Sequence, residues 1–213
     1  MNTLIAVPCM DSVPAVFAQS LAMLKKVGTC AICFQISSLV YDSRNKLGKK
    51  ALEMGADLVL WLDSDMVFEP NLLVDMVETL EKENLDILSG VYYRRSEPFT
   101  PVLFDKTERT PANQISVSEF EEIPDKGLFE VGSCGFGCVL MRAQVLFDVM
   151  AHYLDLFSPI GRSGEDVAFC VRAKELGYKI MADPSIVLGH ASHTIVTKQF
   201  YEAYKGVKNH GTN

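Results

Sequence analysis

The sequence predicts one α/β domain with a mostly parallel central sheet, flanked by helices and carrying a small antiparallel addition. In residues 1–95, short apolar runs alternate with segments of helical spacing, as in strands joined by right-handed crossovers. From Ser96 onward, Pro- and Glu-rich segments with short strands replace that pattern. The 213 residues, 48% hydrophobic, can bury a core without disulfides or a structural metal.

In the first half, strands are expected over residues 4–7, 29–36, 57–62 and 87–93, and helices over 13–26, 44–54 and 69–80. Pro8 is expected to end the first strand, Ser43 to cap the second helix, and Gly55 to stop that helix. In the second half, strands are expected over 101–104, 115–117, 128–131, 139–141 and 179–181, and helices over 142–153 and 165–176. The two halves form one continuous domain.

The balance of 27 acidic against 20 basic side chains gives a net charge of -7. This charge argues against a broad cationic surface for nucleic acid or anionic lipid. No apolar run approaches the roughly 20 residues of a membrane helix, and the N-terminus lacks the features of a signal peptide. We therefore expect a cytoplasmic protein without a membrane span.

The six cysteines are expected to be reduced, buried thiols, as is typical of that compartment. Cys30, Cys33, Cys134 and Cys138 together suggest a four-thiolate zinc site as a minor alternative. However, Cys30 and Cys33 lie in a strand-like run, where residues three apart point to opposite faces. Zinc is therefore disfavoured.

The most informative segment is the apolar run that leads directly into Asp63, Ser64 and Asp65. Two carboxylates so close repel each other unless a positive group lies beside them. Open α/β sheets bind ligands at the carboxyl ends of their strands, and hard oxygen ligands suit Mg2+ or Mn2+. The plainer alternative is that Asp63 caps a turn and Asp65 is solvated.

Two further acids, Glu165 and Asp166, follow Gly164 at the start of an expected helix. Acids in a first helical turn are often only caps. One of them can instead point into a cleft as a general base, and the helix start is expected to favour its ionised form.

Three other features have both a structural and a functional interpretation. His190 follows an apolar run and Gly189, a position from which an imidazole can reach a metal. Gly132, Gly135 and Gly137 permit tight turns or close approach of a ligand to the backbone. Arg44 and Asn45, at the start of a lysine-bearing helix, can hold a nucleotide, although solvated lysines explain most of that cationic cluster.

Taken in order, these residues resemble the nucleotide-sugar-dependent glycosyltransferases of the GT-A fold, particularly small family-2-like enzymes of bacteria and phages. The matching pieces are spread over about nine-tenths of the chain and comprise residues 5–8, 43–45, 55–68, Pro70, 88–92, 131–137, 164–166 and 188–190. The resemblance implies a nucleotide-binding half (1–95), an acceptor and metal half (96–193) and a C-terminal tail (194–213).

The resemblance also implies roles for single residues. Pro8 resembles the floor of the nucleoside pocket, with Arg44 and Asn45 beside the base or phosphates. In the DxD motif, Asp63 and Ser64 match positions that bind the donor, and Asp63 also matches a position beside the ribose or the metal. Asp65 matches a metal ligand, and so does His190.

The backbone wall beside the transferred sugar is matched by Gly135, Phe136 and Gly137. Asp166, with Glu165 next to it, occupies the place of the catalytic base. The chain departs from the family after His190, which leaves His193 as the alternative ligand.

The implied activity is transfer of a sugar from a UDP- or GDP-linked donor to an acceptor hydroxyl, with Mn2+ or Mg2+ and with inversion if Asp166 is the base. Retention is the alternative if no base lies on that face. Two rival functions are a sugar-phosphate nucleotidyltransferase, which would carry a basic Gly-rich loop after the first strand, and a non-catalytic nucleotide- or carbohydrate-binding module. The acceptor is left open between a glycan, a protein and a modified nucleobase.

Overall fold

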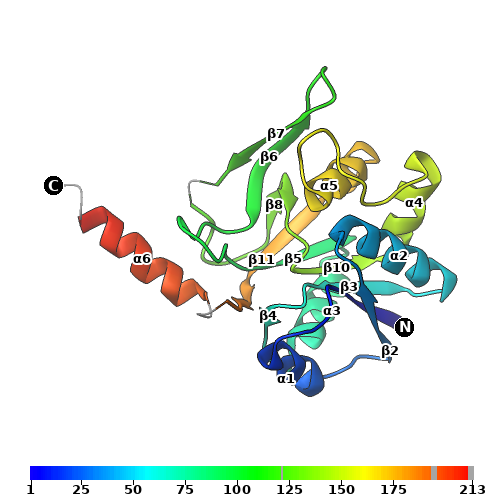
Figure 1. Ribbon diagram of the computed structural model, residues 1–213, viewed down its shortest axis with the longest axis horizontal. Coiled ribbons are helices and arrows are strands. Elements are labelled where there is room, and N and C mark those ends of the chain that lie inside the picture. The colour runs from blue at the N-terminus through cyan, green and yellow to red at the C-terminus, as the bar shows by residue number, and fades with distance from the viewer. Residues whose placement is uncertain (121, 193–195, 211–213) are drawn as a thin grey trace.

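A computed structural model describes residues 1–120, 122–192 and 196–210, with only the backbone of 206–210 (Figure 1). Its centre is a seven-stranded sheet in which all strands run parallel except β10 and β8. In spatial order these strands are β2 (Thr29–Ile36), β1 (Asn2–Cys9), β3 (Leu58–Leu62), β10 (Cys138–Arg142), β5 (Ile87–Val91), β11 (Ile180–Val187) and β8 (Phe129–Val131). The expected fold class, with its mostly parallel sheet, is confirmed.

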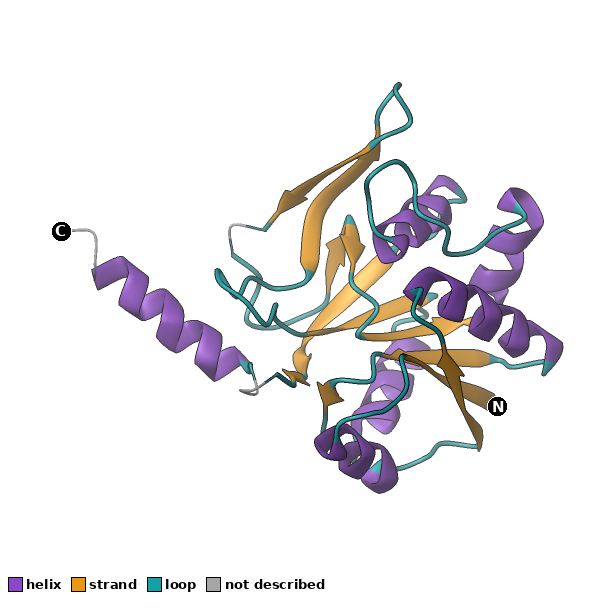
Figure 2. Cartoon of the chain, in the orientation of Figure 1, coloured by secondary structure: helices purple, strands orange, loops and turns teal. Residues whose placement is uncertain are grey.

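Helices cover both faces of this sheet (Figure 2). One face packs against α2 (Val40–Glu53), α4 (Ala143–Tyr153) and α5 (Glu165–Glu175), and the other against α1 (Ala15–Met23) and α3 (Leu72–Lys82). Alternate residues of β3 enter the two cores, since Trp61 belongs to the first and Leu60 to the second. Burial on both sides explains why β3 is an unbroken apolar run.

Two small antiparallel sheets form the addition. One contains β7 (Ile115–Glu119), β6 (Leu103–Arg109) and β9 (Ser133–Cys134), and the other pairs β12 (Gly189–His190) with β4 (Met66–Val67). The β12 pair places Gly189 opposite Val67 and His190 opposite Met66. It therefore brings His190 next to the segment that follows Asp65.

The boundaries expected at Pro8, Ser43 and Met181 are among those that differ in the structure, whereas Gly55, with a φ of 62°, does end α2. The strand β1 continues through Pro8 to Cys9, because β3 stops pairing at Ala6 and places no ladder partner beside Pro8. Ser43 lies inside α2, where its hydroxyl donates to the Gln35 carbonyl at 3.3 Å. The last long strand, β11, runs through Pro184 to Val187 with a register irregularity after Ala182.

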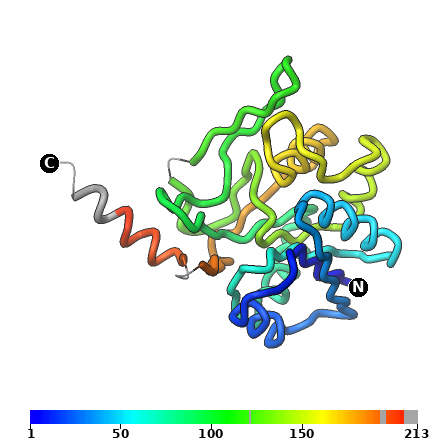
Figure 3. Tube along the Cα trace, viewed as in Figure 1, coloured from blue at the N-terminus to red at the C-terminus, as the bar shows by residue number. Residues whose placement is uncertain are grey.

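The C-terminal segment contains a helix, α6 (Lys198–His210), that the sequence interpretation left unassigned. Figure 3 shows that its first turns project away from the sheet. Its first turns are attached to the segment after β5, with Tyr201 stacked on Tyr93 at 4.7 Å and Phe99 against Phe200 and Tyr204. Among the described residues, no helix has both the length and the apolar character needed to cross a membrane.

Candidate active site

A cavity of about 560 Å3 lies where β1 and β3 end. Ligands of open α/β sheets bind at this edge. Five of the expected site residues line it, namely Pro8, Asp63, Ser64, Asp65 and His190. The rest of its wall consists of Cys9, Met10, Ser37, Ser38, Val40, Ser43, Tyr92, Arg94, Arg95, Ser96 and Val102.

Beneath the cavity, Arg44 joins two carboxylates from different elements. Its Nη2 lies 2.7 Å from Asp63 Oδ1 and its Nη1 lies 2.6 Å from Glu165 Oε1. The Arg44 side chain is only 3% exposed. Burial alone would lower the pKa of Arg44, but the carboxylates of Asp63, Glu165 and Asp166 outweigh it and raise that pKa. Arg44 is thus a permanent buried cation that holds Asp63 in place.

Asn45, the other expected nucleotide contact of α2, is also turned away from the cavity lining. Its side-chain oxygen accepts the backbone N–H groups of Leu156 and Phe157 at 3.2 and 3.0 Å. These bonds tie α2 to the segment after α4.

Asp65 lies between a cation and an imidazole. Its Oδ2 is 2.9 Å from Arg95 Nη1 and 3.5 Å from His190 Nε2. Burial works to raise the pKa of Asp65, but His190 and Arg95 outweigh it and lower that pKa. His190 Nδ1 lies 2.8 Å from the carbonyl oxygen of Tyr93, and Tyr92 packs edge-on against the same ring at 5.5 Å.

The side chains around Asp65 provide some, but not all, of the ligands that a divalent cation needs. Within the described residues, no cluster of three His, Cys, Asp or Glu side chains is arranged to hold a metal. Asp65 and His190 nevertheless offer an oxygen and a nitrogen that face each other. Mg2+ commonly takes one or two protein carboxylates and completes its shell with substrate phosphates and water. Asp65 suits that mode of binding, and His190 adds the nitrogen ligand that a transition-metal cation such as Mn2+ also accepts.

Asp166 lies in the first turn of α5, next to Glu165. Its Oδ1 accepts the Val167 N–H at 2.7 Å. Burial, with a contribution from Glu165, raises the pKa of Asp166 to about 6 despite the opposing charge of Arg44. The helix start was expected to favour the ionised form, and burial outweighs that effect. A pKa of about 6 still leaves most of this carboxyl ionised at neutral pH.

The family model described as Glycosyl transferase family 2 matches residues 47–149. Among solved structures, A197 from STIV is 21% identical with a TM-score of 0.62, and the alignment covers 92% of this chain and 94% of that one. The structure of GalNAc-T7 with UDP, GalNAc and Mn2+ is 9% identical with a TM-score of 0.61 and coverages of 89% and 43%. The chain has the GT-A fold and resembles family-2 glycosyltransferases.

TarS from S. aureus is a further neighbour, 15% identical, with a TM-score of 0.52 and coverages of 85% and 58%. The chain therefore spans nearly all of A197 but about half the length of the GalNAc-T7 and TarS structures. No curated protein sequence matches it. The GT-A fold expected from the sequence motifs is confirmed, and the family-2 model matches part of the chain, residues 47–149.

In this GT-A domain, the segment Gly135-Phe136-Gly137 lies behind the cavity wall. A Cβ atom on Gly137 would lie 2.6 Å from Cζ of Tyr92, and the Gly137 N–H donates to the Tyr92 hydroxyl at 3.2 Å. Phe136 is buried against Trp61. The space beside this backbone was expected to receive a ligand, but the side chain of Tyr92 occupies it. Tyr92 itself lines the cavity.

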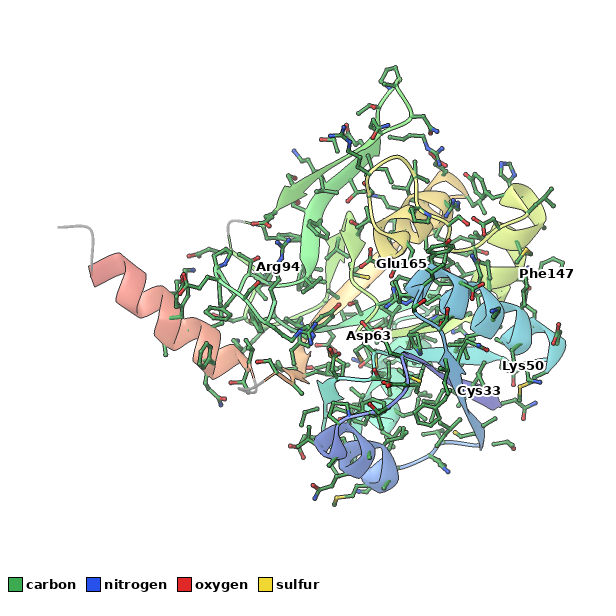
Figure 4. All side chains as sticks on the ribbon, in the orientation of Figure 1. Cys33, Lys50, Asp63, Arg94, Phe147 and Glu165 are labelled. Atoms are coloured by element: carbon green, nitrogen blue, oxygen red, sulfur yellow. The ribbon has the colours of Figure 1, made fainter. Side chains whose placement is uncertain are left out.

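The cavity also has a basic wall that was not expected from the sequence. Arg94 and Arg95 follow β5 at the same edge of the sheet as Asp63, and Arg94 pairs with Glu119 of β7 at 3.1 Å. Figure 4 shows Asp63 near the middle of the molecule, with Arg94 and Glu165 on either side. The available signal was an Arg-Arg pair directly after an apolar strand, in an acidic protein.

Other expected features are found elsewhere. His193, the alternative metal ligand, lies outside the described residues. All six cysteines are free, but only Cys134, Cys138 and Cys170 are buried. Cys9, Cys30 and Cys33 are partly exposed because β2 is an edge strand and Cys9 ends β1.

Proposed function

We propose that this GT-A domain transfers a sugar from a nucleoside-diphosphate sugar, UDP- or GDP-linked, to an acceptor hydroxyl. The observation that carries the proposal is the meeting of Asp63, Asp65 and His190 at one cavity on the carboxyl edge of the sheet. The volume of about 560 Å3 lies within the range typical of small-molecule sites. The family-2 match and the UDP in the GalNAc-T7 structure support a nucleotide donor.

The two walls of the cavity suit the two ends of such a donor. Pro8, Ser37 and Ser38 line one part and offer an apolar ring and hydroxyls for the nucleoside. Arg94 and Arg95 supply guanidinium groups, which bind phosphate oxygens through paired hydrogen bonds. Asp63, held by Arg44, is available to accept hydrogen bonds from the ribose hydroxyls.

Asp65 and His190 would hold the divalent cation, Mn2+ or Mg2+. When bound, such a cation offsets the negative charge that develops on a departing diphosphate. The Tyr93 carbonyl fixes the ring orientation of His190, and a bond of this kind typically accompanies a metal-binding histidine.

Asp166 would accept the proton of the acceptor hydroxyl as its oxygen attacks the anomeric carbon. A base with a pKa of about 6 is both mostly ionised at neutral pH and able to take up a proton. Attack from the face opposite the leaving diphosphate inverts the anomeric configuration. Retention is the alternative stereochemical outcome, with Asp166 in a different role.

The decisive experiment is a donor screen with the whole chain. UDP- and GDP-sugars are incubated with Mn2+ or with EDTA, and release of UDP or GDP is measured. We expect release from one donor class, lost in EDTA and strongly reduced in Asp65→Asn. Glycan, protein and modified-nucleobase acceptors are then compared for acceleration with the active donor. Mn2+-dependent binding without any turnover would favour a binding module instead.

A further inference from the structure

One oxygen atom of the cavity, Oδ2 of Asp65, is approached from two sides. Arg95 Nη1 lies 2.9 Å from it and His190 Nε2 lies 3.5 Å from it. Arg95 belongs to the segment between β5 and β6, whereas His190 belongs to β12. The two groups therefore contend for the same carboxylate oxygen.

The hydrogen bond at Nδ1 of His190 shows what its other ring nitrogen, Nε2, offers to a ligand. The Tyr93 carbonyl oxygen, 2.8 Å from Nδ1, can only accept, so Nδ1 carries the proton. In the neutral ring, Nε2 then directs a lone pair toward Asp65. A metal cation between Nε2 and Oδ2 can take the place of the proton through which the charged ring lowers the pKa of Asp65.

Arg95 is a cation held loosely enough to be exchanged. Its side chain is 51% exposed and that of Asp65 is 25% exposed. Ion pairs with this much solvent contact contribute little to stability. Arg95 also lines the cavity, where its guanidinium can bind phosphate oxygens in a two-pronged geometry.

We propose that Arg95 competes with a divalent cation for Oδ2 of Asp65, and that the diphosphate of the nucleotide relieves this competition by binding Arg95. The proposal rests on the function proposed above and concerns how nucleotide and cation are coupled. A cation that binds alone must displace Arg95 and then lies close to a like charge. A cation that binds with a diphosphate provides Arg95 with a new anionic partner.

The consequence is that cation and nucleotide strengthen each other's binding. Such coupling is reciprocal, because each ligand must change the affinity of the other by the same factor. The chain would therefore bind free Mn2+ weakly and the Mn2+–UDP pair well. Arg95 would be the residue that sets the ratio between these two affinities.

The test compares the full-length protein with Arg95→Gln and Arg94→Gln. Free Mn2+ is titrated by electron paramagnetic resonance, and UDP is titrated by calorimetry at saturating Mn2+. Arg94 is the matched control, because it lines the same cavity but pairs with Glu119 rather than Asp65. The side chains of Arg94 and Arg95 are 40% and 51% exposed, so we expect both variants to fold, and circular dichroism checks this.

We expect Arg95→Gln to bind Mn2+ alone about fivefold more tightly and to bind UDP with Mn2+ about tenfold more weakly, within the usual range of coupling factors. Arg94→Gln should weaken UDP but leave the affinity for Mn2+ alone unchanged. Unchanged or weaker Mn2+ binding in Arg95→Gln, or an equal gain in Arg94→Gln, would overturn the inference. UDP binding that ignores Mn2+ in the unmodified protein would instead contradict the metal role itself.

Discussion

Arg44 bridges Asp63 and Glu165, with nitrogen–oxygen distances of 2.7 and 2.6 Å. The bridge connects α2, the end of β3 and the start of α5 through one buried side chain. Asp63 lines the cavity and Asp166 follows Glu165, so Arg44 sets the relative position of the two carboxylate groups that the proposed reaction uses.

Arg44→Met should lower the free energy of unfolding by about 3–5 kcal/mol, because it leaves two partly buried carboxylates without their cation. Urea denaturation measures this. Lys46→Met is the control on the same helix, since Lys46 forms an exposed i,i+4 pair with Asp42 and should cost at most about 0.5 kcal/mol. Equal losses in the two variants would show that the buried Arg44 bridge stabilises the fold no more than the exposed Lys46 pair does.

Sugar transfer should fall about tenfold per pH unit below about pH 6, where Asp166 becomes protonated. Asp166→Asn should slow transfer by roughly 10²–10⁴-fold and remove this pH dependence from the residual rate. The pH–rate profile at saturating donor provides the measurement. If the rate of the unmodified protein does not change between about pH 5 and 7, on either side of the pKa of about 6, Asp166 is not the base.

The same substitution should not destabilise the fold. The folded-state pKa of Asp166, about 6, lies above its ordinary value of 3.8, so the folded protein binds this proton more tightly than the unfolded chain. The contribution of this group to stability therefore declines as pH rises between those values. Asp166→Asn should unfold at equal or higher urea concentration above pH 6, whereas Glu165→Gln, which breaks the Arg44 bridge, should unfold earlier.

His190→Ala should weaken Mn2+-dependent UDP binding about 10–100-fold, as is typical when a group of a metal site is lost. His152→Ala, an exposed histidine of α4, is the matched control and should have no effect. Calorimetry with Mn2+ and with EDTA separates metal-dependent from metal-independent binding. His193→Ala belongs in the same series, and a larger effect there than at His190 would transfer the ligand role to His193.

Gly137→Ala should cost about 1–3 kcal/mol, because its new methyl group meets the buried ring of Tyr92. A double-mutant cycle with Tyr92→Ala tests the cause, since Gly137→Ala should cost much less once the ring is absent. Donor affinity should also fall in Gly137→Ala because Tyr92 lines the cavity. Equal costs in the two backgrounds would assign the effect to another contact.

Much of the fold follows from local patterns in the sequence. The run at β3 is apolar at every position and predicts a strand covered on both faces, and β2 occupies the range expected for it. Gly55 ends α2 as predicted, because glycine readily adopts the left-handed conformation found there. Element boundaries at Pro8 and Ser43 were wrong, since each depends on a neighbouring strand rather than on the residue alone.

The direction and neighbours of β10 were decided only by the tertiary structure. Its buried residues fit between β3 and β5 in an antiparallel sense, yet the same apolar pattern suits either direction because both faces are covered. The sequence likewise placed acids at Asp63, Asp65 and Asp166 and a histidine at residue 190. Motif spacing singles out such residues without showing which partners they meet across the fold.

Those partners come from distant parts of the chain. Arg44 meets Glu165 across 121 positions, and the Tyr93 carbonyl meets His190 across 97. Arg44, expected beside the nucleotide, became a buried bridge, while Arg95 took a place on the cavity wall. The sequence by itself determined which residue types stand at the ends of the strands. Only chain packing decided which charges are buried together and which side chains face the cavity, because these depend on contacts between segments far apart in sequence.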